Sequence, residues 1–374
     1  MQKNKLLTKE EEINFFLNTL VNSKIISIDI EFMRRNTFFP EPCVIQISDG
    51  NNHGCIDLTL EINYKEIFKN IFDNNKIIVL HSCRQDLEIL YMLLGYIPKK
   101  IFDTQFAASF LGYKYQIGYA EVMKEIFQIE IDKTEKMTNW KKRPLTENQI
   151  KYALNDVIYL NNLYDNLEKK LVKSKKNIYF KEEFKNYLND IDWEPETDMA
   201  WKRIKSINGL GKIAYDAAKI ISVWRERKAI DLNLPRNWIL SEKEIIEVSK
   251  NFSINNKINL PKKNKILDID KESSKILYSI KNISTKNENI NAIPRTKIKN
   301  NIEYKKIADD LYEYYKMVAL KNNISYQIVS PKKMILSYLK NNDKNSRLIN
   351  GWRKNLIDIN KITEITKDFF HANH

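Results

Sequence analysis

Residues 24–32 have the sequence KIISIDIEF. It is rich in β-branched residues and predicts a strand. Because side chains of a strand point alternately to its two faces, Asp29 and Glu31 share one face, and Ile28 and Ile30 share the other. Two carboxylates on an apolar strand are unfavourable unless a cation offsets their charge. A strand with a solvated polar face also explains the pair, which by itself leaves metal binding open.

Around this stretch, the first half of the chain alternates between expected strands and expected helices. Further strands are expected at residues 43–48, 53–58 and 76–80, and Asp49-Gly50 indicates a hairpin between the first two. Helices are expected at residues 66–72, 84–94, 103–111, 119–127 and 147–171. Strands compatible with antiparallel pairing, followed by βα units, predict an α/β domain with a mixed sheet flanked by helices. We assign residues 1–190 to it.

The second half of the chain changes to a helical pattern from about residue 200. Apolar residues recur there at spacings of three and four, and strand signals nearly vanish. We expect two small all-α domains at residues 197–280 and 297–374. A polar stretch rich in Asn, Lys and Ser, residues 281–296, is the expected linker.

Length and composition limit the class of protein. The chain has 374 residues, with 43% hydrophobic and 29% charged residues, so a wholly disordered protein is excluded. Three cysteines, Cys43, Cys55 and Cys83, form no CxxC motif and predict neither a disulfide scaffold nor a cysteine zinc site. A reducing compartment fits this usage. The chain shows no signal peptide and no apolar run long enough to span a membrane, so we expect a soluble cytoplasmic protein.

The positive charge is concentrated in the second half. The formal net charge is +14, and residues 1–190 hold 27 Lys and Arg against 26 Asp and Glu, which leaves 35 against 22 for residues 191–374. A basic half joined to a neutral half is typical of nucleic-acid binding. Lysines around 202–228 and 257–265 are expected to contact phosphates. Compositional drift toward Lys, Asn and Ile also explains a high isoelectric point, so charge alone does not decide the partner.

Three further residues complete a set that suits phosphodiester chemistry. Asp86 begins an expected helix after the strand at 76–80, and Tyr152 and Asp156 lie one turn apart on another helix. Each has an ordinary explanation alone, such as a carboxylate at a helix start. Together, the four carboxylates, in the order D-x-E, then D, then Y-x-x-x-D, supply the oxygen ligands that two Mg²⁺ or Mn²⁺ ions need. Two such ions stabilise the attacking and leaving oxygens of a phosphodiester displacement.

No other motif competes with this set. The four histidines include no HExxH, and no Cys/His spacing suits zinc. Gly209-Leu210-Gly211-Lys212 is too short for a phosphate-binding loop and is typical of a helix-capping turn.

The segments around these residues resemble the ribonuclease D family, within the DEDD superfamily of 3′–5′ exonucleases. The resemblance covers most of residues 20–175. The similar segments are 28–32, 37–40, 44–47, 81–88, 102–108, 133–135, 140–145 and 149–157. Two departures from the family pattern are Ile30 and the pair Cys83-Arg84, and Arg84 is expected to alter substrate contacts.

The resemblance implies a ribonuclease H-like sheet and a role for each residue. Asp29, Glu31 and Asp156 would hold the ion that activates water. Asp29 would also contact a second ion, on which Asp86 would act through the hydration shell. Tyr152 stands four residues before Asp156, which implies the subclass whose tyrosine orients the attacking water.

The helical half carries a second resemblance. Residues 210–248 are similar to the HRDC domain, a helical module of RecQ-type helicases and ribonuclease D. Residues 301–356, including Gly351-Trp352-Arg353, weakly resemble a second HRDC domain. Trp201, Trp224 and Trp352 are interpreted as core anchors in preference to base-stacking platforms.

The resemblance implies a metal-dependent 3′–5′ exoribonuclease that releases nucleoside 5′-monophosphates. Its expected partner is RNA, as 3′ ends of tRNA precursors and other small structured RNAs, and it is expected to act as a monomer. Two alternatives remain open. One is a DNA-directed exonuclease in repair, and the other is a non-catalytic RNA-binding protein on a nuclease scaffold.

Overall fold

The structure is a computed structural model that describes residues 5–72, 75–132, 134–261, 268–286 and 302–371. The chain divides into two compact units. The first comprises residues 1–33, 42–191 and 297–374, and the second comprises residues 34–41 and 192–296. Among the described residues, no helix is both long enough and apolar enough to cross a membrane.

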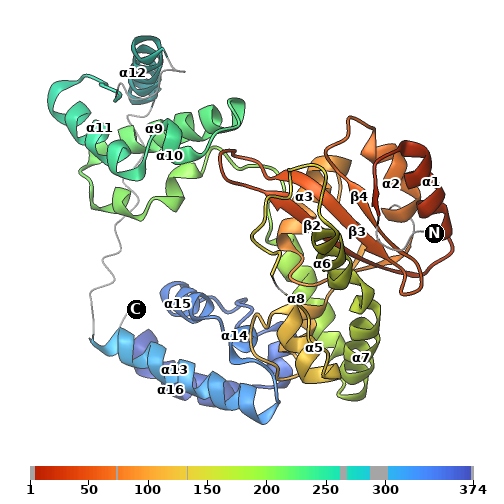
Figure 1. The fold of residues 1–374 in the computed structure, drawn as a ribbon. Helices are drawn as coiled ribbons and strands as arrows, with labels where there is room; N and C mark the ends of the chain where they lie inside the picture. Colours follow the sequence, from red (N-terminus) through yellow and green to blue (C-terminus); the bar gives the residue numbers. More distant parts are fainter. Residues whose placement is uncertain (1–4, 73–74, 133, 262–267, 287–301, 372–374) are drawn as a thin grey trace. The chain divides into compact units, whose positions relative to one another are not determined.

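A mixed sheet forms the centre of the first unit (Figure 1). It has six strands in the order β1-β4-β3-β2-β5-β6. The strands are β1 (Leu6–Leu7), β2 (Ile25–Met33), β3 (Glu41–Ser48), β4 (His53–Asp57), β5 (Ile77–Leu80) and β6 (Lys100–Asp103). β3 and β4 pair antiparallel, whereas β1 with β4, β2 with β5 and β5 with β6 pair parallel. The predicted α/β class is therefore confirmed. The short strands β1 and β6 were not predicted because their few residues give no periodic signal.

The hairpin between β3 and β4 is the expected one. Gly50 has a φ of +94°, which a residue with a side chain rarely adopts. The Asp49 carboxylate accepts hydrogen bonds from the backbone N–H groups of Asn51 and Asn52. The turn is thus stabilised by a local side chain, as its sequence predicts.

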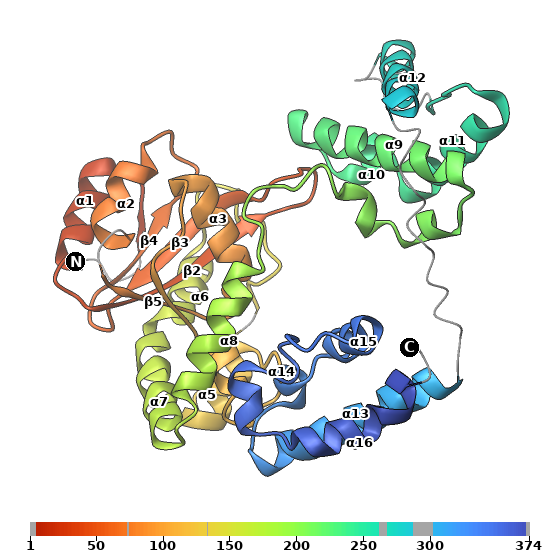
Figure 2. The same ribbon diagram turned by 180° about the vertical axis from the view of Figure 1, so that it is seen from behind.

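Helices cover both faces of this sheet. The helices of the domain are α1 (Glu10–Thr19), α2 (Tyr64–Phe72), α3 (Arg84–Leu94), α4 (Thr104–Ser109), α5 (Tyr119–Phe127), α6 (Glu147–Ile158), α7 (Leu160–Lys173) and α8 (Asn177–Asn189). On β4, Gly54 faces Phe16 of α1, while the next residue, Cys55, clusters with Ala153 and Leu154 of α6. Adjacent strand residues point to opposite faces, so α1 and α6 lie on opposite sides of the sheet (Figure 2).

One expected helix is two in the structure. Residues 147–171 were expected to be continuous, but α6 ends at Ile158, Tyr159 interrupts it, and α7 begins at Leu160. The break lets α6 contact β2 and β4 while α7 contacts β2 and β5. Periodicity alone did not reveal it because the apolar spacing continues across Tyr159.

The second unit is a helical bundle that also includes the loop between β2 and β3. Its helices are α9 (Lys212–Asp231), α10 (Arg236–Ile239), α11 (Glu242–Asn255) and α12 (Ile269–Lys286), preceded by the 3-10 turns η1 (Ala200–Arg203) and η2 (Lys205–Gly209). From the loop at 34–41, Phe38 is buried with Ala229 and Ile239. The Asn233 side chain accepts hydrogen bonds from the N–H groups of Phe38 and Phe39.

The C-terminal helices repeat the pattern of the second unit. They are α13 (Ile302–Lys321), α14 (Tyr326–Val329), α15 (Lys332–Asn341), the turn η3 (Gly351–Asn355) and α16 (Ile359–His371). α13, α14 and α15 each begin 90 residues after α9, α10 and α11 respectively, and α9 and α13 are both 20 residues long. Asn233 and Asn323 hold the same left-handed position in the two copies, with φ of 49° and 47°. The sequence therefore encodes one helical motif twice.

The expected linker at 281–296 is only partly described. Residues 281–286 are the end of α12, and residues 287–296 lie outside the described residues. Of the lysine-rich stretch at 257–265, residues 262–265 also lie outside the described part.

Candidate metal centre

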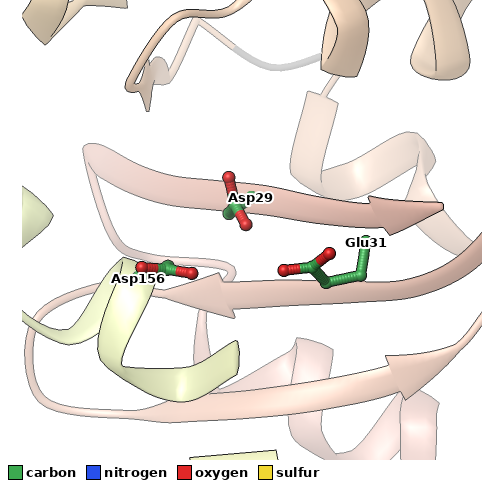
Figure 3. A group of neighbouring side chains, drawn as sticks. All are labelled: Asp29, Glu31 and Asp156. Atoms are coloured by element: carbon green, nitrogen blue, oxygen red, sulfur yellow. The ribbon is translucent and has the colours of Figure 1, made fainter. Parts of the chain in front are cut away.

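Three carboxylates meet on one face of the sheet. Asp29 and Glu31 share a face of β2, and Asp156 approaches them from α6 (Figure 3). One ligand oxygen from each lies within 4.8 Å of the others. The alternation along β2 thus orients its two acids as expected, because Ile28 and Ile30 are buried on the opposite face.

Helix α6 is fixed at its N-terminus, which sets the position of its acidic residue. Thr146 and Gln149 form a capping box, in which each side chain bonds the other residue's backbone N–H. Buried Ile150, Ala153 and Leu154 pack this helix in a cluster with Val44, and Tyr152 is partly buried against the same cluster. The helix is therefore held at one end and along one side, and Asp156 follows near its C-terminal end.

Tyr152 lies one turn before Asp156 and forms a hydrogen bond with its carboxylate. Its ring centroid is 5.9 Å from that of Trp140. Burial first, then the negative charges of Asp156 and Glu31, raise the pKa of Tyr152 further above its ordinary value. The phenol therefore stays protonated at neutral pH and can act by hydrogen bonding but not as a base.

Asp86 is close to this group without belonging to it. Among the described residues, Asp29, Glu31 and Asp156 are the acids near enough to share one ion. Asp86, buried in the first turn of α3, accepts a hydrogen bond from the Ile30 N–H. Burial, and then the charge of Asp29, raises the pKa of Asp86 well above its ordinary value. Asp86 therefore lies within the electrostatic field of the group without sharing its ligand oxygens.

The start of α3 is positioned by a second acid. Asp103 accepts hydrogen bonds from the N–H groups of Ser82 and Cys83. It also caps α4 by accepting from Gln105 and Phe106. Ser82 has a φ of 67°, an uncommon conformation that these bonds stabilise. Asp103 therefore connects β6, α4 and the turn that leads to Asp86.

The three central carboxylates repel one another in a poorly solvated site. Burial raises the pKa of Asp29 to about 6. Burial, followed by repulsion from Asp29, raises the pKa of Asp156 to about 8 and that of Glu31 to about 9. Three acids so arranged need a cation to be ionised together at neutral pH. An all-oxygen donor set of this kind fits Mg²⁺ or Mn²⁺.

Two residues near the site were not singled out from the sequence. The positive charge of Lys136 lowers the pKa of both Glu31 and Asp156. Tyr119, at the start of α5, lies in the field of Asp156 and Asp29, which together with burial raises its pKa. Neither carries a motif signal, because a loop lysine and a tyrosine at a helix start are common on any surface.

The other residues discussed from the sequence have structural partners. Arg84 hydrogen-bonds the Tyr187 hydroxyl of α8. The three cysteines are buried and form no disulfide. Trp352 is fully buried, while Trp201 and Trp224 are partly buried against the core of the second unit.

Comparisons with known proteins identify relatives of this chain. A family described as 3′–5′ exonuclease matches residues 4–172. Ribonuclease D of Bartonella henselae is 36% identical over 249 residues, which is 66% of this chain and 60% of that protein. Ribonuclease D of Desulfotalea psychrophila is 31% identical over 252 residues, which is 67% of each chain. Across the first three relatives, this chain matches only 60% to 64% of their length.

Solved structures share the fold. The crystal structure of Escherichia coli RNase D, titled an exoribonuclease involved in structured RNA processing, has a TM-score of 0.84 at 22% identity, and covers 98% of this chain and 99% of its own. The catalytic core of RRP6 from Trypanosoma brucei has a TM-score of 0.56 at 18% identity, and covers 75% of this chain and 80% of its own. At such identities these likenesses concern the fold alone.

Proposed function

The chain belongs to the ribonuclease D family of 3′–5′ exonucleases, and from this premise we propose that it removes nucleotides from the 3′ end of single-stranded RNA. The observation that carries the proposal is the group of Asp29, Glu31 and Asp156, with ligand oxygens within 4.8 Å of one another. A partly buried group of three like charges is destabilising unless cations occupy it.

Each acid has a proposed place in the reaction. When bound, two divalent cations would act as Lewis acids that favour ionisation of a water molecule and stabilise charge on the phosphodiester. Asp29, Glu31 and Asp156 would hold one ion, and Asp29 would also face the second. Asp86, buried beside Asp29, would act on the second ion through its hydration shell.

Tyr152 would orient the attacking water. Its hydroxyl proton is taken up by the hydrogen bond to Asp156, so its oxygen remains free to accept a hydrogen bond from water. Attack on the last phosphodiester would release a nucleoside 5′-monophosphate and leave a shortened 3′-hydroxyl end.

The proposed substrates are 3′ ends of tRNA precursors and other small structured RNAs. A single strand must reach the carboxylates, while the folded body of the RNA would contact the basic residues of 191–374. We propose that this half comprises two HRDC domains, at 197–280 and 297–374. The 90-residue repeat of the α9–α11 pattern in α13–α15 supports the second of them. We further propose that the protein acts as a monomer in the cytoplasm.

Degradation of a 5′-labelled single-stranded RNA tests the proposal. The wild type with Mg²⁺ or Mn²⁺ should give a ladder that shortens from the 3′ end and disappears with chelator. Asp156→Asn should lower kcat by about 100-fold or more, because a cation ligand contributes several kcal/mol to the transition state.

Asp165→Asn provides the matched control, since Asp165 is an exposed acid on α7. It should retain wild-type activity. If the wild type leaves RNA intact with either ion yet shifts its mobility in a gel, the protein binds RNA without degrading it, and the non-catalytic alternative is supported. Faster degradation of a matched DNA strand would favour the DNA-directed alternative.

A further inference from the structure

The break between α6 and α7 lies beside the acidic group. Only Tyr159 separates the two helices, and its carbonyl already accepts the Leu163 N–H of α7. In a continuous α-helix, the Tyr159 N–H would bond the carbonyl of Asn155, four residues earlier. Asn155 directly precedes Asp156, so the backbone conformation at the end of α6 affects the position of the Asp156 carboxylate.

The Tyr119 hydroxyl occupies this break. It donates a hydrogen bond to the Asn155 carbonyl at 3.3 Å. The backbone N–H of Tyr159 donates in turn to the Tyr119 oxygen. One hydroxyl thus bonds both groups that an unbroken helix would pair with each other. The Tyr159 N–H is also directed at the Val157 carbonyl, so the Tyr119 oxygen shares this donor.

Tyr119 is itself held in place. Its ring meets the His81 ring edge to face, with centroids 5.5 Å apart. The two nitrogens of His81 lie 2.9 Å from Thr104 Oγ1 and from the Ile117 carbonyl. Gln105 Nε2 donates to the same carbonyl at 3.0 Å. The chain just before Tyr119 is therefore fixed to His81, directly after β5, and to α4, which leaves the ring little freedom.

We propose that Tyr119 is a positioning residue for the reaction, whose hydroxyl ends α6 and so holds Asp156 and Tyr152 in register with Asp29 and Glu31. The proposal rests on the proposed function for its kinetic consequence but not for its effect on metal binding. Without the hydroxyl, the Asn155 carbonyl and the Tyr159 N–H would turn toward each other. The last turn of α6 would then rotate, and the Asp156 carboxylate would leave its position opposite β2.

Tyr119→Phe tests the proposal because it removes only the hydroxyl and keeps the ring against His81. The affinity for Mn²⁺ alone is measured from the electron paramagnetic resonance signal of the free ion. It should fall by about tenfold or more, as is usual when a residue that orients a metal ligand is removed. On labelled RNA, kcat should fall by a similar factor while KM for RNA changes less than about twofold, since the RNA contacts are untouched.

Tyr64→Phe is the matched control, because the buried Tyr64 hydroxyl also bonds backbone carbonyls, those of Asp57 and Leu60, but on α2. Both variants should lower Tm by a similar small amount, and only Tyr119→Phe should affect Mn²⁺ binding. Equal Mn²⁺ affinity in Tyr119→Phe and wild type overturns the proposal, whether or not the wild type degrades RNA. An inactive wild type with weakened Mn²⁺ binding in the variant would overturn the exonuclease assignment alone.

Discussion

Glu31 shows most clearly what the site requires of single residues. In the folded chain without metal, burial and the neighbouring charges of Asp29 and Asp156 raise its pKa to about 9. In the unfolded chain the same carboxyl titrates near pH 4. Between these values the folded state holds more protons than the unfolded state, so the free energy of unfolding falls as pH rises. Below about pH 4 and above about pH 9 the slope from Glu31 vanishes, because both states are then equally protonated.

At the residue scale we therefore predict that Glu31→Gln stabilises the metal-free protein at alkaline pH. In chelator at pH 8, the variant should be more stable than wild type by about 2 kcal/mol, because the wild type must take up a proton at Glu31 on folding and the amide of the variant does not. The advantage should shrink toward pH 5. Saturating Mg²⁺ should reverse the order, since the ion stabilises only a folded state that binds it well.

Thermal melts from pH 5 to pH 9, with and without Mg²⁺, measure the stability difference between Glu31→Gln and wild type. Glu125→Gln on α5, where the residue is exposed, is the control and should show neither effect. A stability difference between Glu31→Gln and wild type that does not change with pH would contradict the raised pKa.

At the scale of elements, the Gly351-Trp352-Arg353 tripeptide joins the C-terminal helices to α8. Both Arg353 Nη atoms bond the Glu183 carboxylate at 2.7 Å, and the arginine side chain is 1% exposed. The Trp352 indole N–H also donates to Glu183, and its backbone N–H donates to Glu182. Gly351 has a φ of 63°, and a Cβ there would collide with Glu182. Each residue of the tripeptide thus has a separate structural role in the contact with α8.

We predict that Glu183→Ala destabilises the protein by about 3 kcal/mol, because it leaves a buried arginine charge without its partner. A matched exposed pair links the same parts of the chain, since Arg347 bonds Asp190 at 2.6 and 2.9 Å. Asp190→Ala should cost less than about 1 kcal/mol, as exposed ion pairs do. Urea unfolding of both variants measures the difference, and equal costs would refute the assigned role of burial.

At the scale of the whole molecule, the two halves of the chain differ in net charge, and the second half contains the repeated helical motif. Nearly all of the net charge of +14 comes from residues after 190. Some cations there are already engaged, because Lys219 lies over the Trp201 ring and Lys228 pairs with Glu272. The expected phosphate contacts of the lysines therefore remain a prediction, and salt dependence tests it.

We predict that cleavage of a tRNA-sized RNA depends strongly on salt. Its kcat/KM should fall by about tenfold or more between about 50 and 200 mM salt, because counterions are released at each phosphate contact. A pentanucleotide that reaches only the carboxylates should lose much less. If both substrates show the same salt slope, the basic half does not contribute to binding.

Features that depend on local order along the chain follow from the sequence alone. The period of two in residues 24–32 placed Asp29 and Glu31 on one face of a strand, and the helical spacing placed Tyr152 one turn before Asp156. Asp49-Gly50 identified the hairpin from its turn chemistry alone. These features follow from backbone geometry over a few residues, so the α/β class could be predicted without knowledge of distant contacts.

Which of these residues meet depends on packing between distant segments, and this the folded structure alone reveals. It grouped Asp156 with the β2 acids and placed Asp86 beside them, which depends on how α3 and α6 pack against the sheet. It interrupted the expected helix at Tyr159, where a hydroxyl from α5 bonds its backbone. It also packed Phe38, from a loop between two strands, into the helical unit. Each depends on contacts between segments distant in sequence, and side-chain periodicity carries no information about those distances.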